Sequence, residues 1–219
     1  MKVLVLLAEG FEEIEALTPV DYLRRAGAEV TLAAISGRGE STSGRGESTS
    51  GRSESTSGRS ESSKKVTGSH KITVEADCRI ADVNASEFDM VICPGGMPGS
   101  SNIAASAKAA DVIRKINSKN GFVAAICAAP VVVLAPLGLL KEKKFTCYPG
   151  MENAIEQFAG SNWKELTSGA SHSKDRVVQD GKTITAGGPG VAEEFALKLV
   201  EVLFGRDKAG ELRKGIVAR

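Results

Sequence analysis

Apolar runs that alternate with helix-like segments constrain the fold of this chain more than any other feature of its sequence. The first run, Lys2–Ala8 (KVLVLLA), is continuous and ends at a turn, which is typical of a strand buried on both faces. A segment with helical spacing of its apolar residues follows at Glu12–Ala26, and a second apolar run follows at Glu29–Ile35. This β-α-β order predicts a parallel sheet with right-handed crossovers.

The same alternation continues along the rest of the chain. Further strands are predicted at Val66–Thr67, Ile72–Val74, Phe88–Pro94, Phe122–Ile126, Phe145–Cys147, Arg176–Gln179 and Lys182–Ala186. Helices are predicted at Ala107–Lys119, Ala128–Ala135, Glu152–Phe158 and Val191–Phe204. The pattern therefore predicts an α/β fold, a flavodoxin-like three-layer sandwich with a mostly parallel central sheet.

One segment does not share this pattern. Residues Ser36–Ser63 repeat a heptapeptide four times (SGRGEST, SGRGEST, SGRSEST, SGRSESS) and contain no apolar side chain. The segment cannot bury enough apolar surface to offset the entropy lost on ordering, so we expect a flexible loop. We therefore expect one domain over residues 1–219 with a low-complexity insertion at 36–63. The insertion is either inert or a serine-rich arm for phosphorylation or docking.

Charge and cysteine usage exclude several classes of function. The formal net charge is +1, so composition offers no electrostatic argument for nucleic acid or an anionic membrane as partner. Residues Phe122–Leu140 carry no charge, but Pro130 and Pro136 favour a strand and a short helix over a membrane span. The four cysteines form no Cys-x-x-Cys pair and there are only two histidines, so we expect no metal site. Free thiols without a signal-peptide pattern favour a cytoplasmic protein.

Cys127 is the strongest candidate for chemistry. It follows the predicted strand Phe122–Ile126 and precedes a predicted helix, in the sequence AAICAAP. Sites in open parallel sheets form beyond the carboxyl ends of the strands, and a strand-to-helix turn is where a nucleophile elbow forms. The N–H groups of a following helix would lower the pKa of the thiol. The alternative is a buried structural cysteine, which is common because a free thiol packs as a small apolar group.

Four motifs occur in a characteristic order: AEGFEEIEA, CPGGMPG, AAICAAP and GGPG. Together they resemble the ThiJ/PfpI superfamily, in particular its glyoxalase III-like branch of parkinsonism-associated protein deglycases. The resemblance covers nearly the whole chain apart from Ser36–Ser63. The cysteine elbow together with the upstream glutamate is its most specific part.

The resemblance implies a role for each matching residue. Cys127 matches the family's nucleophilic, oxidation-sensitive cysteine, and Glu15 matches the glutamate that hydrogen-bonds this sulfur. Gly95, Gly96 and Ala128 match positions whose backbone amides form an oxyanion-type pocket. Without the resemblance, Glu15 would pass for an ordinary acid in the first turn of a helix, as we expect for Glu12 and Glu13.

Departures from the superfamily pattern exclude one activity and leave two residues open. Its protease branch has histidine directly after the cysteine, where this chain has Ala128, so we expect no protease activity. Tyr148 stands where some relatives have a histidine, and could hydrogen-bond a substrate carbonyl or simply cover the core. His70 stands where relatives have an arginine that reaches the partner subunit, although a lone surface histidine is the simpler interpretation.

The remaining thiols and His172 lack the features of Cys127. Cys93 ends a predicted buried strand and is expected in the core, whereas Cys78 and Cys147 have no nearby base in the sequence and should be less reactive. His172 is expected in a loop.

The resemblance implies a cofactor-independent glyoxalase or deglycase. Cys127 would attack methylglyoxal, glyoxal or an early glycation adduct on a protein, and Glu15 would act as general acid and base. The alternative is an oxidative-stress sensor or chaperone that works through oxidation of Cys127. A weaker alternative is an anion cradle at PGGMPGS, which lacks the lysine of a P-loop. The family usually forms homodimers, so we expect one here.

Overall fold

The computed structural model describes residues 1–35 and 64–218, so the expectations for Ser36–Ser63 lie outside the described residues. Its eleven strands are β1 (Lys2–Ala8), β2 (Glu29–Ile35), β3 (Lys65–Thr67), β4 (Thr73–Glu75), β5 (Cys78–Arg79), β6 (Met90–Cys93), β7 (Phe122–Ile126), β8 (Lys144–Phe145), β9 (Ser171–His172), β10 (Val177–Asp180) and β11 (Thr183–Ala186). Its α-helices are α1 (Glu13–Arg25), α2 (Gly99–Ala105), α3 (Ala107–Ser118), α4 (Ile155–Ala159), α5 (Trp163–Leu166), α6 (Ala192–Phe204) and α7 (Arg206–Gly215).

A seven-stranded sheet forms the centre of the molecule, with the strand order β10-β11-β7-β6-β1-β2-β5. All neighbouring pairs are parallel except β10 and β11, which form a hairpin around Gly181. The chain winds outward in both directions from β1, so the order reverses between β1 and β6. Ligands of such sheets bind at the carboxyl ends of the strands near this reversal. The mixed, mostly parallel α/β architecture predicted from the sequence is confirmed.

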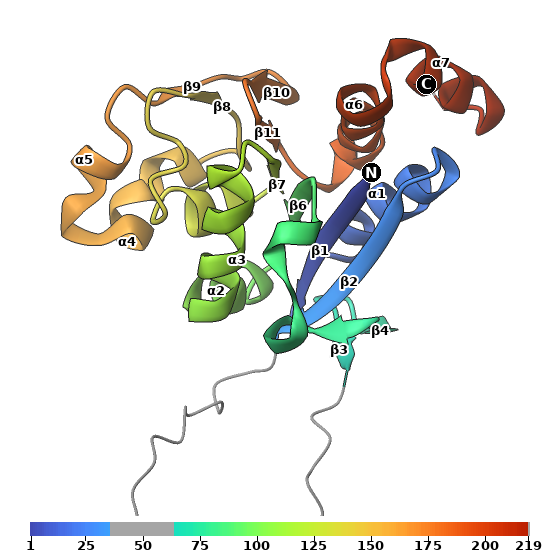
Figure 1. Cartoon of the computed structure of the whole chain (residues 1–219). Coiled ribbons are helices and arrows are strands. Elements are labelled where there is room, and N and C mark those ends of the chain that lie inside the picture. The colour runs from blue at the N-terminus through green and yellow to red at the C-terminus, as the bar shows by residue number, and fades with distance from the viewer. Residues whose placement is uncertain (36–63, 219) are drawn as a thin grey trace, which may run out of the picture.

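Helices cover both faces of the sheet (Figure 1), which explains why the central strands β1, β6 and β7 are apolar on both faces. Along β1, alternate side chains enter two separate cores. Val3, Val5 and Leu7 pack with residues of α1 and α6, and Leu4 and Leu6 pack with residues of α2 and α3. The alternation follows from the two-residue period of a strand. Helices on both faces and the sheet between them form the three predicted layers.

The segment after β7 differs from the predicted helix Ala128–Ala135. It is a five-residue π-helix, Pro130–Leu134, and its side chains are buried. Continuous burial explains the uncharged run that resembles a membrane span in length: β7 and this π-helix fill the core. Among the described residues, no helix combines the length and the apolar character that crossing a membrane requires.

Candidate active site

The carboxyl ends of three neighbouring strands bring the predicted site residues together. Glu15 lies in the first turn of α1, after β1. Gly95 follows β6, and Cys127 follows β7 directly. A Cβ built on Gly95 would lie 2.5 Å from the Cβ of Cys127 and would overlap the Glu15 carboxylate. The three residues therefore pack against one another, as the sheet topology leads one to expect.

The backbone of Cys127 has the form of a nucleophile elbow. Its φ is 65°, in the left-handed region that residues other than glycine rarely adopt. Two hydrogen bonds anchor it: its N–H donates to the carbonyl of Ala186 over 2.9 Å, and its carbonyl accepts from the N–H of Tyr148 over 2.8 Å. Such conformations persist only where the surroundings hold them, and they concentrate at functional sites.

The Glu15 carboxyl group is fully buried and points at the thiol. The N–H of Gly95 donates to Oε2 of Glu15 over 2.9 Å, and the Glu15 side chain is hydrogen-bonded to Cys127. Oε1 is buried and has no hydrogen-bond partner among the described residues. Burial raises the pKa of Glu15 to about 8, and the nearby charge of Glu12 contributes. At neutral pH the group is therefore mostly protonated and can donate a hydrogen bond.

The prediction of a lowered thiol pKa at Cys127 is wrong. Burial, together with the ionised Glu15 beside it, raises the pKa of this thiol to about 12. The N–H groups of Gly96 and Ala128 bond to the sulfur and act in the opposite direction, but they are outweighed. The contribution of Glu15 disappears when its carboxyl is protonated. A protonated Glu15 therefore opposes ionisation of the thiol less than an ionised Glu15 does.

The three predicted amides divide between two tasks. Those of Gly96 and Ala128 bond to the sulfur of Cys127, which suits an oxyanion-type pocket. The amide of Gly95, in contrast, is occupied by Glu15. The expectation that Gly95 belongs to the same pocket is therefore corrected: it holds the acid in place, and its missing side chain makes room for the acid and the thiol.

Tyr148 lies at the edge of the site. Its backbone N–H holds the Cys127 carbonyl, while its side chain is 49% exposed, so it does not cover the core. The ring lies close to Gly188, where a Cβ would approach Cδ2 to 3.3 Å.

His70 is not the lone surface histidine that the sequence favoured. Its Nδ1 lies 2.8 Å from Oε2 of Glu13, and its backbone N–H donates to Oε1 of the same carboxylate over 2.7 Å. The hydrogen bond to Glu13 raises the pKa of His70. Burial alone would raise the pKa of Glu13, but its bonds to His70 lower it overall.

Glu12, next to Glu13, caps α1 by accepting from the N–H of Glu15 over 2.8 Å. Both acids are buried; Glu13 lies in the first turn of α1, as expected, whereas Glu12 precedes the helix as its N-cap.

The other thiols are less suited to reaction. Cys93 is fully buried, as predicted, and burial raises its pKa to about 12. Burial also raises the pKa of Cys147 to about 12. The sequence gives Cys147 no neighbouring base, but the fold brings Glu152 within 3.9 Å of it. Cys78 is partly buried on the edge strand β5.

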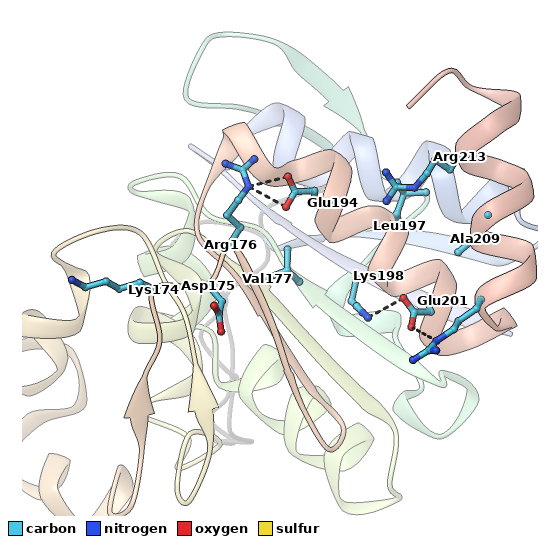
Figure 2. Close-up of a pocket in the computed structure, with 12 residues that line it drawn as sticks. Lys174, Asp175, Arg176, Val177, Glu194, Leu197, Lys198, Glu201, Ala209 and Arg213 are labelled. Atoms are coloured by element: carbon cyan, nitrogen blue, oxygen red, sulfur yellow. Dashed lines mark hydrogen bonds and ion pairs between the residues drawn. The ribbon is translucent and has the colours of Figure 1, made fainter. Parts of the chain in front are cut away.

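A concavity lies away from Cys127, between β10, α6 and α7 (Figure 2). It has a volume of about 780 Å³ and highly charged walls. Its charges are largely paired: Arg176 with Glu194, and both Lys198 and Arg206 with Glu201. No cysteine or histidine lines it. The nucleophile and the acid that could do chemistry are therefore both at the Cys127 edge.

Comparison with known proteins agrees with this arrangement. Residues 1–202 match the model of the DJ-1/PfpI family. The chain belongs to this family. Protein dj-1beta of Drosophila melanogaster is 37% identical over 98% of this chain and 95% of its own length. The glutathione-independent glyoxalase DJR-1.2 of Caenorhabditis elegans is 31% identical over 96% of this chain and 92% of its own.

Solved structures of DJ-1 proteins have the same fold. The crystal structure of Drosophila melanogaster DJ-1beta superposes with a TM-score of 0.78 at 36% identity, covering 100% of this chain and 98% of that one. The oxidized DJ-1 of Toxoplasma gondii superposes with a TM-score of 0.76 at 33% identity, covering 99% and 98%. The resemblance found in the sequence motifs is thus confirmed, and the DJ-1/PfpI family includes members named as glyoxalases.

Proposed function

We propose that this chain is a cofactor-independent glyoxalase or deglycase that acts on methylglyoxal, glyoxal or early glycation adducts. The observation that carries the proposal is the buried Glu15 carboxyl hydrogen-bonded to the Cys127 thiol at the carboxyl edge of the sheet. This pair places a nucleophile beside a proton carrier. A glyoxalase among the relatives, at 31% identity, supports the same reaction class.

The first step forms a bond between the sulfur of Cys127 and the aldehyde carbon. Ionised Glu15 takes the thiol proton, and the sulfur attacks to give a hemithioacetal. Glu15 then returns this proton to the former carbonyl oxygen, which becomes the hydroxyl of the adduct, and Glu15 is ionised again. The Gly96 and Ala128 amides bond to the sulfur. They would stabilise the negative charge that forms on the former carbonyl oxygen during the attack.

The next steps move a hydrogen between neighbouring carbons. Glu15 removes the proton from the former aldehyde carbon and returns a proton to the adjacent carbon, while the hydroxyl proton passes from the first oxygen to the neighbouring one, so the hemithioacetal becomes a thioester. One carbon is oxidised and its neighbour is reduced, and no external electron acceptor is used. Water then cleaves the thioester, releasing lactate from methylglyoxal or glycolate from glyoxal and regenerating the thiol. For a glycated protein, hydrolysis of the adduct would also free the amine.

The direct test is production of lactate from methylglyoxal by the wild type and by the Cys127→Ala and Glu15→Ala variants. We expect both variants to lose nearly all activity. Cys78→Ala is the matched control because Cys78 is also a partly buried thiol but lies on the edge strand β5, and it should keep wild-type activity. Equal activity in all four proteins would contradict the proposal.

A second candidate function is that of an oxidative-stress sensor or chaperone that works through the same cysteine. Protonated Glu15 and the amides of Gly96 and Ala128 are donors that suit a sulfinate at Cys127. Two molecules of hydrogen peroxide would each transfer one oxygen to the sulfur and leave as water. Titration with peroxide and intact-mass measurement distinguishes the two functions: a sensor gains two oxygens at Cys127 at low oxidant, whereas an enzyme turns over methylglyoxal when fully reduced.

We also propose that the chain acts as a cytoplasmic homodimer. Ile14 and Met97 lie near the Cys127 edge and are 52% and 49% exposed, so they offer apolar surface that a second copy could cover. Light scattering after gel filtration tests the assembly, and a monomer at micromolar concentration would overturn it.

A further inference from the structure

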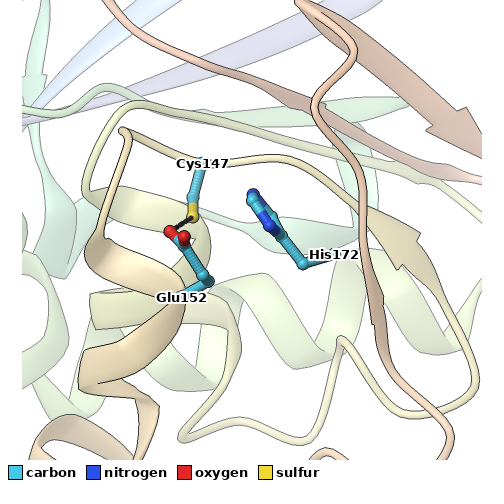
Figure 3. Close-up of side chains that lie close together, drawn as sticks. All are labelled: Cys147, Glu152 and His172. Atoms are coloured by element: carbon cyan, nitrogen blue, oxygen red, sulfur yellow. Dashed lines mark hydrogen bonds between the residues drawn. The ribbon is translucent and has the colours of Figure 1, made fainter.

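Three donor side chains that the proposed mechanism does not use converge in the region after β8 (Figure 3). Cys147 comes two residues after β8, Glu152 lies on the 3₁₀ helix Met151–Ala154, and His172 ends β9. Their sulfur, carboxylate oxygen and ring nitrogen all lie within 4.8 Å of one another. Segments separated in the sequence thus supply a thiol, a carboxylate and an imidazole to one place.

The fold holds each donor in position. β8 and β9 pair in parallel with Phe145 opposite His172, and the two rings lie 5.5 Å apart between centroids. The N–H of Ser173 donates to the carbonyl of Phe145 over 2.7 Å. The thiol of Cys147 is buried and lies 3.9 Å from Oε2 of Glu152. The ring of His172 therefore stands beside the thiol–carboxylate pair because strand pairing puts it there.

The imidazole has no other task that the structure reveals. Within residues 1–35 and 64–218, no hydrogen bond or ion pair engages its ring nitrogens; its only described contact is with the ring of Phe145. In Figure 3 the ring lies next to Cys147 and Glu152. His172 is exposed, whereas Cys147 is buried and Glu152 partly buried. The cluster thus has an open side through which a small solute can reach it.

The donor types indicate which solute fits. A thiolate, an imidazole and a carboxylate are the three protein ligands of Zn²⁺, and three such ligands leave a fourth, open position in a tetrahedral site. At the usual zinc–ligand lengths of about 2.0–2.3 Å, the donor atoms of a tetrahedral site lie about 3.5 Å apart. The present separations, 3.9 Å for sulfur and carboxylate and up to 4.8 Å overall, require closure by about 1.3 Å at most.

We propose that Cys147, Glu152 and His172 bind one Zn²⁺ ion, with water at the fourth position on the exposed side of His172. On binding, the Cys147 sulfur gives up its proton to solvent and forms a bond to the metal, without any change of oxidation state. The sequence argued against a metal because no Cys-x-x-Cys pair is present. That argument does not apply to this site, because His172 is distant in the sequence from Cys147 and Glu152.

A cysteine-hydrolase triad fits the same residues less well. In a triad the imidazole stands between the nucleophile and the carboxylate, and the nucleophile faces the substrate. Here the carboxylate contacts the thiol directly, and the thiol is buried. A metal ion needs only an opening of its own size, which the exposed His172 side provides.

The site is also linked to Cys127 through the backbone. Tyr148 follows Cys147 directly, and its N–H donates to the Cys127 carbonyl over 2.8 Å. A bound ion would tie the segment 147–152 to β9 and so stabilise the support of the elbow. Because a ligand that binds only the folded state stabilises it, Zn²⁺ should raise the melting temperature in proportion to the logarithm of its concentration.

Co²⁺ is a specific probe of thiolate coordination. A cobalt–thiolate bond gives a ligand-to-metal absorption band in the near ultraviolet that carboxylates and imidazoles do not produce. Reduced protein freed of metal by a chelator is titrated with Co²⁺, and the bound Co²⁺ is then displaced with Zn²⁺. We expect one equivalent of Co²⁺ to produce the band and one equivalent of Zn²⁺ to remove it. The same protein titrated with Zn²⁺ against a chromophoric chelator gives the affinity.

Variants identify the ligands. Cys147→Ser should abolish the band, and His172→Ala, a change at an exposed residue that should not disturb folding, should weaken Zn²⁺ binding by more than the roughly 10–100-fold that loss of an outer-shell partner costs. Glu152→Gln should weaken it similarly. Cys127→Ser and His70→Ala are the matched controls, since they remove the active-site thiol and the other histidine of the chain, and neither should change binding.

Two results would overturn the proposal. One is the absence of a thiolate band at stoichiometric Co²⁺ in the wild type. The other is a band that disappears in Cys127→Ser but persists in Cys147→Ser, which would assign metal binding to the active-site thiol. Because the readout is absorption and not turnover, neither result depends on the proposed glyoxalase activity.

Discussion

The carboxyl group of Glu15 is completely buried and hydrogen-bonded to the thiol of Cys127, while one of its two oxygens has no partner among the described residues. Burial without full hydrogen bonding disfavours the ionised acid, and for this reason the pKa of Glu15 is raised to about 8. The arrangement is costly for the fold and useful for proton transfer. Stability and activity should therefore respond to pH in opposite directions.

The stability of the fold should fall as Glu15 ionises. Its pKa is about 8 in the folded chain and near 4.5 when unfolded, so the folded state binds more protons between these values. Stability is then highest at low pH within this window and decreases as pH rises through it. Between pH 5.5 and 8.5 the loss from this group is on the order of 3 kcal/mol.

Glu15→Gln isolates this effect because the amide cannot ionise. The variant should gain in melting temperature over the wild type at pH 8.5 and show little gain at pH 5.5. Thermal unfolding of both proteins at the two pH values measures the difference in melting temperature. A gain of equal size at both pH values would show that ionisation of Glu15 is not its cause.

Much of this site could be predicted from sequence because it depends on local patterns and topology. Apolar runs predicted the central strands, and the carboxyl-edge rule then brought Glu15, Gly95 and Cys127 together. Three helices escaped prediction, one of them the four-residue α5 (Trp163–Leu166). Helix α7 (Arg206–Gly215) has no buried residue, and α2 (Gly99–Ala105) is rich in small residues, so neither carries an apolar period. The segment 128–135 reads as an α-helix because periodicity does not separate α from π geometry in so short a run.

What could not be predicted depends on burial and on contacts between distant residues. The pKa of Cys127 was predicted from its neighbours in sequence, whereas in the fold desolvation outweighs the amides of Gly96 and Ala128. The bond between His70 and Glu13 joins residues 57 positions apart. No local sequence pattern predicts the raised pKa of Cys127 or the bond between His70 and Glu13. The same holds for Cys147 and His172, which only the pairing of β8 with β9 brings together.

Catalysis should require ionised Glu15, so its rate should rise with pH. The carboxylate takes the proton from the thiol and then from carbon, and below its pKa of about 8 this form is the minority. We expect kcat/KM for methylglyoxal to increase about tenfold per pH unit below the midpoint and to level off above it. The measurement is lactate formation from pH 6 to 9, corrected for the uncatalysed reaction.

Glu12→Gln provides the internal check on this profile. The charge of Glu12 contributes to the raised pKa of Glu15, and a glutamine oxygen can still accept the N–H of Glu15 that Glu12 accepts now. The variant should therefore shift the midpoint of the profile to lower pH while the helix cap is kept. A midpoint that does not move, or a wild-type profile that is flat over the whole range, would contradict the assignment.

Gly95 should be irreplaceable for steric reasons. A Cβ at this position would lie 2.5 Å from the Cβ of Cys127 and would overlap the Glu15 carboxylate, so Gly95→Ala must displace the acid or the nucleophile. We expect a destabilisation of about 1–3 kcal/mol, as for overpacking in a core, and loss of most lactate-forming activity. Gly190→Ala is the matched control, because a Cβ there meets no atom within 4 Å. Comparable effects in the two variants would refute the steric explanation.

The His70–Glu13 pair should be visible as a shifted titration. The hydrogen bond to Glu13 raises the pKa of His70 above its usual 6.5, although the imidazole is exposed. In Glu13→Gln the amide oxygen can still accept a hydrogen bond, but the negative charge is gone, so the pKa of His70 should fall back toward 6.5. NMR titration of the two imidazoles resolves this, with His172 as the second, independent signal. A His70 pKa that is unchanged by Glu13→Gln would mean that the carboxylate charge does not act on it.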